Sequence, residues 1–268
     1  MATANGIVDS VDLPVRTMAC SPILPPALAG SSFEVSFIDE AGAQRREPLP
    51  SCWNLPFERA GPSRSFPSFK GQRNFPGLWW SATTGEHVGY ESWVERDVAM
   101  LLDFDPEIVA FSSQPFWLIW PGQQGERRHA PDFFARRADG TGVVIDVRPD
   151  DLVDPKAAEV LDATASACGE VGWESRRTGG PSAVLAANVR WLAGYRHPRC
   201  RRPEIADALI ERFSEPMPLF AGAAAVGDRL AVLPVLYHLL WRHALTTDLA
   251  TAPLSPGSLV CLAEEAAP

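Results

Sequence analysis

The chain has 268 residues, of which 46% are hydrophobic and 21% charged, which is typical of a globular protein with room for two domains. The formal net charge of −9 argues against a protein that simply coats nucleic acid. The five cysteines show no zinc-binding or paired spacing, the N-terminus lacks a secretory pattern, and no apolar run is long enough to span a bilayer. We therefore expect a cytoplasmic protein without a membrane anchor.

The first third of the chain changes from low order to regular structure. Residues 1–30 are rich in Pro, Ala and Ser, and we expect them to be poorly ordered. The alternation of residues 33–39 predicts a strand, while residues 49–80 carry many Pro, Gly and aromatic residues and predict an irregular lead-in. Apolar residues then recur every three or four positions over residues 91–102, which predicts an amphipathic helix.

The middle of the chain predicts a sheet. Residues 108–120 are apolar and rich in strand formers, but Gln114-Pro115 interrupts them, which fits two strands or one bent strand. Residues 131–137 and 143–148 flank the turn-forming segment 138–142, which predicts a hairpin.

A helix and a returning strand should complete this part of the chain. Asp154-Pro155 predicts a helix start, with an N-cap Asp and Pro at the first helical position, and Gly169 predicts its end. Residues 171–177 can return as a strand. The order of elements indicates an α/β fold with a mixed sheet flanked by helices over residues 31–180.

The segment 178–181 is a natural domain boundary, because it carries two glycines and a proline. Beyond it, the tail 245–262 could supply a small wing, so we expect a helical, winged-helix-like domain over residues 181–268. The predicted helices of this domain cover residues 184–195, 203–214, 218–226 and 229–244.

Three acidic residues, Glu95, Asp132 and Asp146, are the candidates for chemistry. If Ala138 pairs with Gly142 in the hairpin, Asp132 faces Arg148, lies diagonal to Asp146 and shares its face of the sheet. A two-residue turn in the same segment would instead send Asp132 to the opposite face.

Two carboxylates on one face repel each other unless a cation lies between them. Hard oxygen ligands with room for water suit Mg²⁺ or Mn²⁺. Such an ion can lower the pKa of a bound water and stabilise charge on a phosphoryl oxygen. The two carboxylates therefore predict a site for a divalent metal ion.

The same residues resemble a known nuclease pattern. Pro131-Asp132-Phe133 and Asp146-Val147-Arg148 are similar to the PD and (D/E)xK elements of restriction-type nucleases. The ordered set resembles the TnsA-like endonuclease family over residues 69–173, and more loosely through the C-terminal helices. Three further segments carry the resemblance: the helical segment 92–97, Phe104-Asp105-Pro106 and Gln114-Pro115.

This resemblance implies a restriction-endonuclease-like catalytic domain whose acidic catalytic residues are Glu95, Asp132 and Asp146. It implies that Asp132 and Asp146 bind the metal, that the carbonyl of Val147 adds a ligand, and that Gln114 supports the site from behind. It further implies cleavage of double-stranded DNA at the 5′ ends of a transposon. The implied partners are a DDE transposase for strand transfer and an ATP-dependent regulator.

One residue departs from the family pattern, since Arg148 stands where the family usually has lysine. Arginine does not lose its proton at working pH, so Arg148 cannot be a general base, although it can hold the scissile phosphate. Lys156, on the following helix, is the alternative lysine.

Other roles compete for several of these residues. Ser92 and Glu95 also form a capping-box pattern, and Glu91 replaces Glu95 as candidate if the helix begins earlier. Asp146 lies within an apolar run, where an unpaired carboxylate is costly, so it needs a partner or a metal. His129 is expected to be a loop residue rather than a ligand.

Arginines are the candidate DNA contacts. Arg127, Arg128, Arg136 and Arg137 bracket Asp132 and are candidates for binding the phosphate backbone. A second basic stretch, residues 190–202, contains five arginines and no acid, and stays open between a solvated face and a DNA contact.

Two other functions remain open. A stand-alone restriction or repair nuclease would have the same site and cut without partners. A catalytically decayed assembly subunit would bind partners and never cut.

Overall fold

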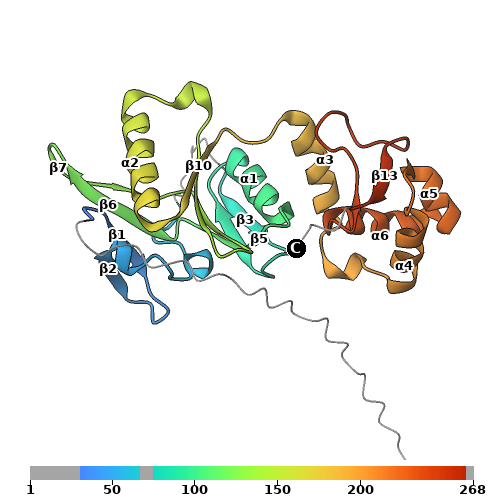
Figure 1. Ribbon diagram of the computed structural model, residues 1–268, viewed down its shortest axis with the longest axis horizontal. Coiled ribbons are helices and arrows are strands. Elements are labelled where there is room, and N and C mark those ends of the chain that lie inside the picture. The colour runs from blue at the N-terminus through green and yellow to red at the C-terminus, as the bar shows by residue number, and fades with distance from the viewer. Residues whose placement is uncertain (1–30, 67–74, 264–268) are drawn as a thin grey trace, which may run out of the picture.

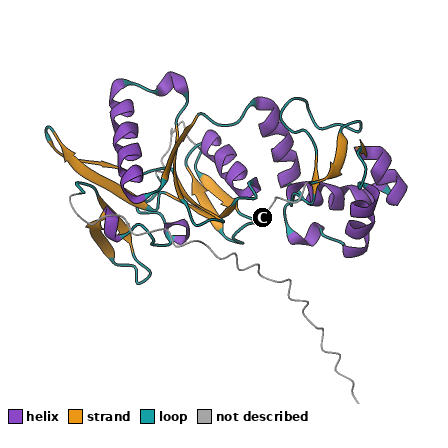
Figure 2. Cartoon of the chain, viewed as in Figure 1, coloured by secondary structure: helices purple, strands orange, loops and turns teal. Residues whose placement is uncertain are grey.

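The computed structural model describes residues 31–66 and 75–263, so the expectation for residues 1–30 lies outside the described residues. The fold is mixed α/β, with most strands in the N-terminal part and most helices in the C-terminal part (Figures 1 and 2). Within the described chain, no helix combines the length and the apolar character needed to cross a membrane.

A first four-stranded sheet has the order β2-β1-β6-β7, with all neighbours antiparallel. The predicted N-terminal strand is confirmed as β1, and the apolar segment 108–120 divides into β5 and β6 at Gln114, whose φ is 49°. The strands are β1 (Glu34–Ile38), β2 (Gln44–Pro48), β6 (Phe116–Gly122) and β7 (Gly125–His129).

The second sheet is mixed, as expected. Its order is β10-β9-β8-β5, with β10 parallel to β9 and the other pairs antiparallel. Its strands are β5 (Ile108–Ser113), β8 (Phe133–Arg137), β9 (Gly142–Val147) and β10 (Glu174–Thr178).

Two helices cover the two faces of this sheet. Helix α1 (Trp93–Phe104) packs Val98 and Leu102 with Phe133 on one face. Helix α2 (Pro155–Val171) links β9 to β10 and packs Cys168 with Val144 on the other face, as the alternating side chains of a strand require. The central strands β8 and β9 are therefore largely buried on both sides, whereas the edge strand β10 is polar along its length.

The hairpin β8–β9 differs in register from the expectation. Arg137 donates its N–H to the carbonyl of Thr141 at 3.0 Å, and Phe133 pairs with Ile145, so the pairing of Ala138 with Gly142 is wrong by two residues. An even shift keeps every side chain on its face. The register places Asp132 opposite Asp146 instead of diagonal to it.

Helix α2 begins as predicted and ends later than predicted. The Asp154 side chain accepts a hydrogen bond from the N–H of Ala157 at 2.7 Å, and Pro155 is the first helical residue. Gly169 does not end the helix, which continues to Val171 and stops at Gly172, whose φ is 71°. Since left-handed backbone favours glycine, the later glycine is the C-cap.

The lead-in expected to be irregular contains regular elements. It holds the short 3₁₀ helices η1 (Leu49–Ser51) and η2 (Phe57–Arg59) and strand β3 (Gly77–Trp80), which pairs antiparallel with β4 (His87–Tyr90) just beyond the lead-in. A third 3₁₀ helix, η3 (Asp150–Leu152), precedes α2.

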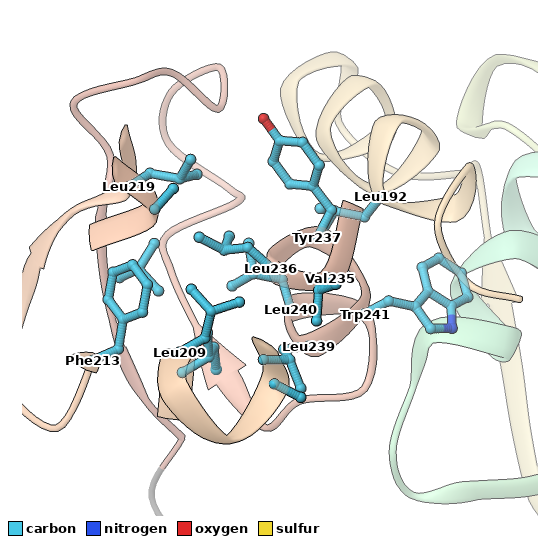
Figure 3. Packing of buried hydrophobic residues seen from close by; sticks show 14 of the residues in the cluster. Leu192, Leu209, Phe213, Leu219, Val235, Leu236, Tyr237, Leu239, Leu240 and Trp241 are labelled. Atoms are coloured by element: carbon cyan, nitrogen blue, oxygen red, sulfur yellow. The ribbon is translucent and has the colours of Figure 1, made fainter. Parts of the chain in front are cut away.

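The four predicted C-terminal helices are confirmed, and the tail supplies a small sheet of order β11-β13-β12. The helices pack their apolar residues inward around one cluster (Figure 3), to which α1 also contributes Met100. The elements are α3 (Ala183–Ala193), η4 (Pro198–Cys200), α4 (Pro203–Arg212), β11 (Met217–Pro218), α5 (Leu219–Val226), α6 (Arg229–Trp241), β12 (Leu245–Thr246) and β13 (Leu259–Leu262).

Candidate active site

A polar cleft of about 570 Å³ lies where β8 begins and β9 ends, beside the N-terminal ends of α1 and α2. It brings together most of the site residues expected from the sequence, although Gln114, Arg136 and Arg137 do not line it. The expected residues that line the cleft are Glu95, Arg127, Arg128, Asp132, Asp146, Val147, Arg148 and Lys156.

Among the acids of the cleft, Asp132 has the carboxyl pKa that is shifted furthest from its usual value. Burial raises the pKa of its carboxyl to about 7, and the negative charges of Glu95 and Asp146 act in the same direction. The N–H of Val147 donates to Asp132 Oδ2 at 2.7 Å, which favours the ionised form but offsets only part of this penalty. The cleft thus disfavours a bare carboxylate at Asp132.

Asp146 has a partner that the sequence did not indicate. Its buried Oδ1 lies 2.6 Å from Nε2 of His129, which is the last residue of β7. The expectation that His129 is a loop residue is therefore wrong. Strand β7 carries Gly, Glu, two Arg and His and is an edge strand, so it lacks the apolar alternation by which strands are recognised.

Glu95 fulfils both of its competing interpretations. It closes the helix start as a capping residue, since Oε2 accepts from the N–H of Glu91 at 2.7 Å and Oε1 from the Ser92 hydroxyl at 2.9 Å. It also lines the cleft, where burial raises the pKa of its carboxyl. Because both oxygens already accept hydrogen bonds, Glu95 is held in place beside Asp132.

Glu91 and Arg64 also line the cleft. They form an ion pair at 3.0 Å, which joins the segment before the undescribed residues 67–74 to the start of α1. Glu91 was the alternative candidate to Glu95, and the structure places both in the cleft. Arg64 carried no signal in the sequence, because it lies in the irregular lead-in far from the acidic motifs.

Three cations of the cleft are free. Arg128, Arg148 and Lys156 are exposed, and none of them forms an ion pair within the described part of the chain. Arg128 lies over the Trp117 ring, with its guanidinium carbon 4.6 Å from the ring centroid. Its neighbour Arg127 is instead paired with Glu159 of α2.

Arg136 and Arg137 have structural partners outside the cleft. Arg136 pairs with Glu58 at 3.1 Å and donates to the carbonyl of Leu55 at 3.0 Å. Arg137 pairs with Glu174 at 2.6 Å. Both residues lie at the end of β8 away from Asp132, so closeness in sequence did not bring them to the acids.

Gln114 lies behind the cleft and holds the main chain next to Asp132. Its N–H donates to the carbonyl of Asp132 at 3.1 Å, and its own carbonyl accepts from the N–H of Ser63 at 2.8 Å. The side chain is fully buried, and its amide has no partner among the described residues. Its backbone, with φ of 49°, is unusual for a non-glycine residue.

The donor set of the cleft suits a hard divalent cation that keeps much of its water. Among the described residues, no three side chains of His, Cys, Asp or Glu form a complete metal cage. Asp132 and Asp146 each retain one carboxylate oxygen without a hydrogen bond in this part of the chain. Mg²⁺ typically binds through one or two carboxylates plus water, and its charge would offset the penalty at Asp132.

Neither the models of known protein families nor the curated protein sequences contain a match to this chain. The role of the cleft must therefore be inferred from its own residues.

Proposed function

We propose that this protein is a metal-dependent DNA endonuclease, the TnsA-like nuclease subunit of a heteromeric transposase. In this proposal residues 31–180 have a restriction-endonuclease-like fold and residues 181–268 a winged-helix-like one. The single observation that carries it is the meeting of Glu95, Asp132 and Asp146 in one cleft that is also lined by cations without an ion pair among the described residues.

The cleft has both acidic residues that can bind a metal ion and basic residues that can bind a phosphate, which fits a phosphodiester substrate. Asp132 and Asp146 occupy adjacent positions at the ends of paired strands, where they repel each other and attract a cation. Arg128, Arg148 and Lys156 carry free positive charge on the same cleft, where they attract an anionic backbone. A phosphate ester can bind both a metal cation held by these acids and the cationic side chains beside it.

Asp132, Asp146 and the carbonyl of Val147 are the residues that would hold Mg²⁺ or Mn²⁺. A bound metal would lower the pKa of a water molecule and stabilise negative charge on the phosphate. His129 holds Asp146 through Oδ1, which leaves Oδ2 without a hydrogen bond among the described residues. Arg148 steadies the phosphate without accepting a proton, because a guanidinium stays charged.

Sequence recognition is left to partners in this proposal. Helix α6 buries Val235, Leu236 and Leu239 in the core, so it does not present polar side chains for base edges. A chain with net charge −9 also has little long-range attraction for DNA. The DDE transposase would therefore place the transposon end at the cleft, and the ATP-dependent regulator would license the reaction.

The test is nicking of a duplex that carries a transposon end, measured in Mg²⁺ with the transposase partner present. We expect Asp146→Asn to abolish nicking and to weaken Mn²⁺ binding in calorimetry, while Glu107→Gln, an exposed acid outside the cleft, retains both. Wild-type cutting by Asp146→Asn would reject the site. Efficient specific cutting by the isolated chain would favour a stand-alone nuclease, and partner binding without any cutting would favour a decayed subunit.

A further inference from the structure

The basic stretch 190–202 is divided by the structure into arginines that hold the fold and arginines that do not. Arg190 pairs with Asp97 of α1 at 2.9 Å. Arg196 lies over the Trp79 ring at 4.2 Å and donates to the carbonyl of Trp80 at 3.0 Å. Arg190 therefore links α3 to α1, and Arg196 links the turn after α3 to β3.

The other three arginines of the stretch are free. Arg199, Arg201 and Arg202 are exposed, and none of them has an ion pair in the described chain. Glu204 is the first acid to follow them, on the first turn of α4, and no ion pair joins it to them.

A fourth arginine, far away in the sequence, joins this group. Arg242 is the C-cap residue of α6, and η4 contacts this helix. Arg242 is also exposed and has no ion pair among the described residues. Burial lowers the pKa of His238, and the positive charges of Arg242 and Arg201 act in the same direction. Both guanidinium groups therefore lie near the same buried imidazole.

Arg199, Arg201 and Arg202 follow one another within residues 199–202 and, like Arg242, have no ion pair in the described chain, so their positive charge is not compensated by a salt bridge. None of these four arginines lines the acidic cleft. Trp191 is a large exposed apolar side chain earlier in the basic stretch, but none of the large exposed apolar side chains of the described chain lies within residues 197–204. A protein partner binds best where an apolar core is buried, whereas a phosphate backbone requires forked cationic donors.

We propose that Arg199, Arg201, Arg202 and Arg242 form a second contact with the phosphate backbone of duplex DNA, separate from the cleavage cleft. This inference rests on the proposed function for its choice of DNA as the polyanion. In this proposal the C-terminal part binds the duplex backbone without reading its sequence. The contacts come from the segment between α3 and α4 and from the C-terminal end of α6, and not from a recognition helix.

The experiment measures binding of the full chain to a labelled duplex of arbitrary sequence by fluorescence anisotropy across a salt series, without divalent metal. The patch variant is Arg199→Ala/Arg201→Ala/Arg242→Ala, which keeps Arg202 as the N-cap residue of α4. The control variant Arg59→Ala/Arg212→Ala/Arg229→Ala removes the same charge from exposed arginines that also have no ion pair among described residues.

We expect the slope of log K against log[salt] to fall by about 0.9 for each lost phosphate contact in the patch variant. The control should keep the wild-type slope. Equal slopes for wild type and patch variant, or an equal fall in the control, would overturn the proposal. Binding of poly-glutamate as tight as that of the duplex would overturn it in favour of an acidic protein partner.

Two additional sets of variants separate loss of DNA binding from loss of folding and from loss of cleavage. If the triple variant loses its thermal transition, single Arg199→Gln and Arg242→Gln substitutions test the same charges with smaller structural change. The series is repeated in Asp146→Asn, which should preserve the patch effect because the cleft is not required for it. A patch effect without any metal-dependent nicking would leave this inference standing while the proposed function fails.

Discussion

Asp132 makes the stability of the protein depend on pH. Its pKa is raised from 3.8 to about 7, so the folded protein holds a proton that the unfolded chain releases. The stabilisation is fully present below about pH 4 and is lost as pH rises through about 7. We expect Asp132→Asn to raise the free energy of unfolding at pH 8 in EDTA, by at most about 4 kcal/mol for a shift of this size.

Denaturant titrations at pH 4 and pH 8 check this prediction. The difference between the variant and wild type should be near zero at pH 4, and Mg²⁺ should reduce it at pH 8 by stabilising only the wild type. Equal stabilities at pH 8 in EDTA would show that Asp132 is not a destabilising carboxylate.

Arg127 and Arg128 are adjacent in β7 but should differ in their effect on DNA binding. Arg128 is free above Trp117, whereas Arg127 is paired with Glu159. We expect Arg128→Ala to weaken binding to any duplex and to reduce the salt slope by about 1. Arg127→Ala should change the slope less, because its charge is already compensated. Anisotropy across a salt series measures both, and a larger slope change for Arg127→Ala would contradict the assignment.

Arg148 should act on the rate of cleavage and not as a base. We expect Arg148→Lys to keep or increase nicking, since an ammonium can also hold a phosphate, and Arg148→Ala to lose about 10²-fold, the effect of removing one transition-state donor. Single-turnover nicking with partners present measures both. If Lys156→Ala proves far more damaging than Arg148→Ala, the lysine on α2 has the role assigned here to Arg148.

At the scale of elements, the two glycines at the end of α2 allow a matched test. Both have no heavy atom within 4 Å of an added Cβ, so only backbone conformation separates them. Gly169 is helical, and Gly169→Ala should stabilise the protein by about 1 kcal/mol. Gly172 has φ of 71°, so Gly172→Ala should destabilise it by about 1–2 kcal/mol. Thermal unfolding of both variants measures this, and effects of the same sign would show that the helix end is misplaced.

The sequence predicted the elements whose signals are local. Asp154-Pro155 identified the start of α2, because an N-cap acid and a proline both act within one turn. The hairpin was predicted from its turn residues, but its register was not, since Asp139 accepts from the N–H of Thr141 and shortens the loop. Strand β7 was missed because its pairing with β6, and not its own composition, makes it a strand.

The candidate site was predictable only in part for the same reason. Asp146 was identified because it lies within an apolar strand, where an unpaired carboxylate is costly, whereas Asp132 was identified from the hairpin and from its place in the PD-type motif. The contact of His129 with Asp146 depends on how two separate sheets meet, which no local pattern encodes. Arg136 forms an ion pair with Glu58 and donates a hydrogen bond to the carbonyl of Leu55. Both partners lie in the lead-in, whose fold was not predicted from the sequence.

At the scale of the whole molecule, we expect the isolated chain to bind DNA weakly, with strong salt dependence and no preference for transposon ends. The reason is that, under the proposed function, the cleft and patch cations would contact only the backbone, while the chain as a whole has a net charge of −9. Competition binding between an end-containing duplex and a scrambled duplex checks this. A clear preference by the isolated chain would contradict the assignment of end recognition to the transposase.

Helix α1 belongs to both halves of the protein. Its first turn holds Glu95 in the cleft, while Met100 lies in the C-terminal core and the carbonyl of Phe104 contacts His243 at 2.5 Å. A helix is stiff along its axis, so these two ends move together. A partner that displaces the C-terminal helices must either break their contact with Met100 or move the whole of α1, including Glu95. Because one helix contacts both cores, we expect a displacement of the C-terminal helices to change the position of Glu95 in the cleft.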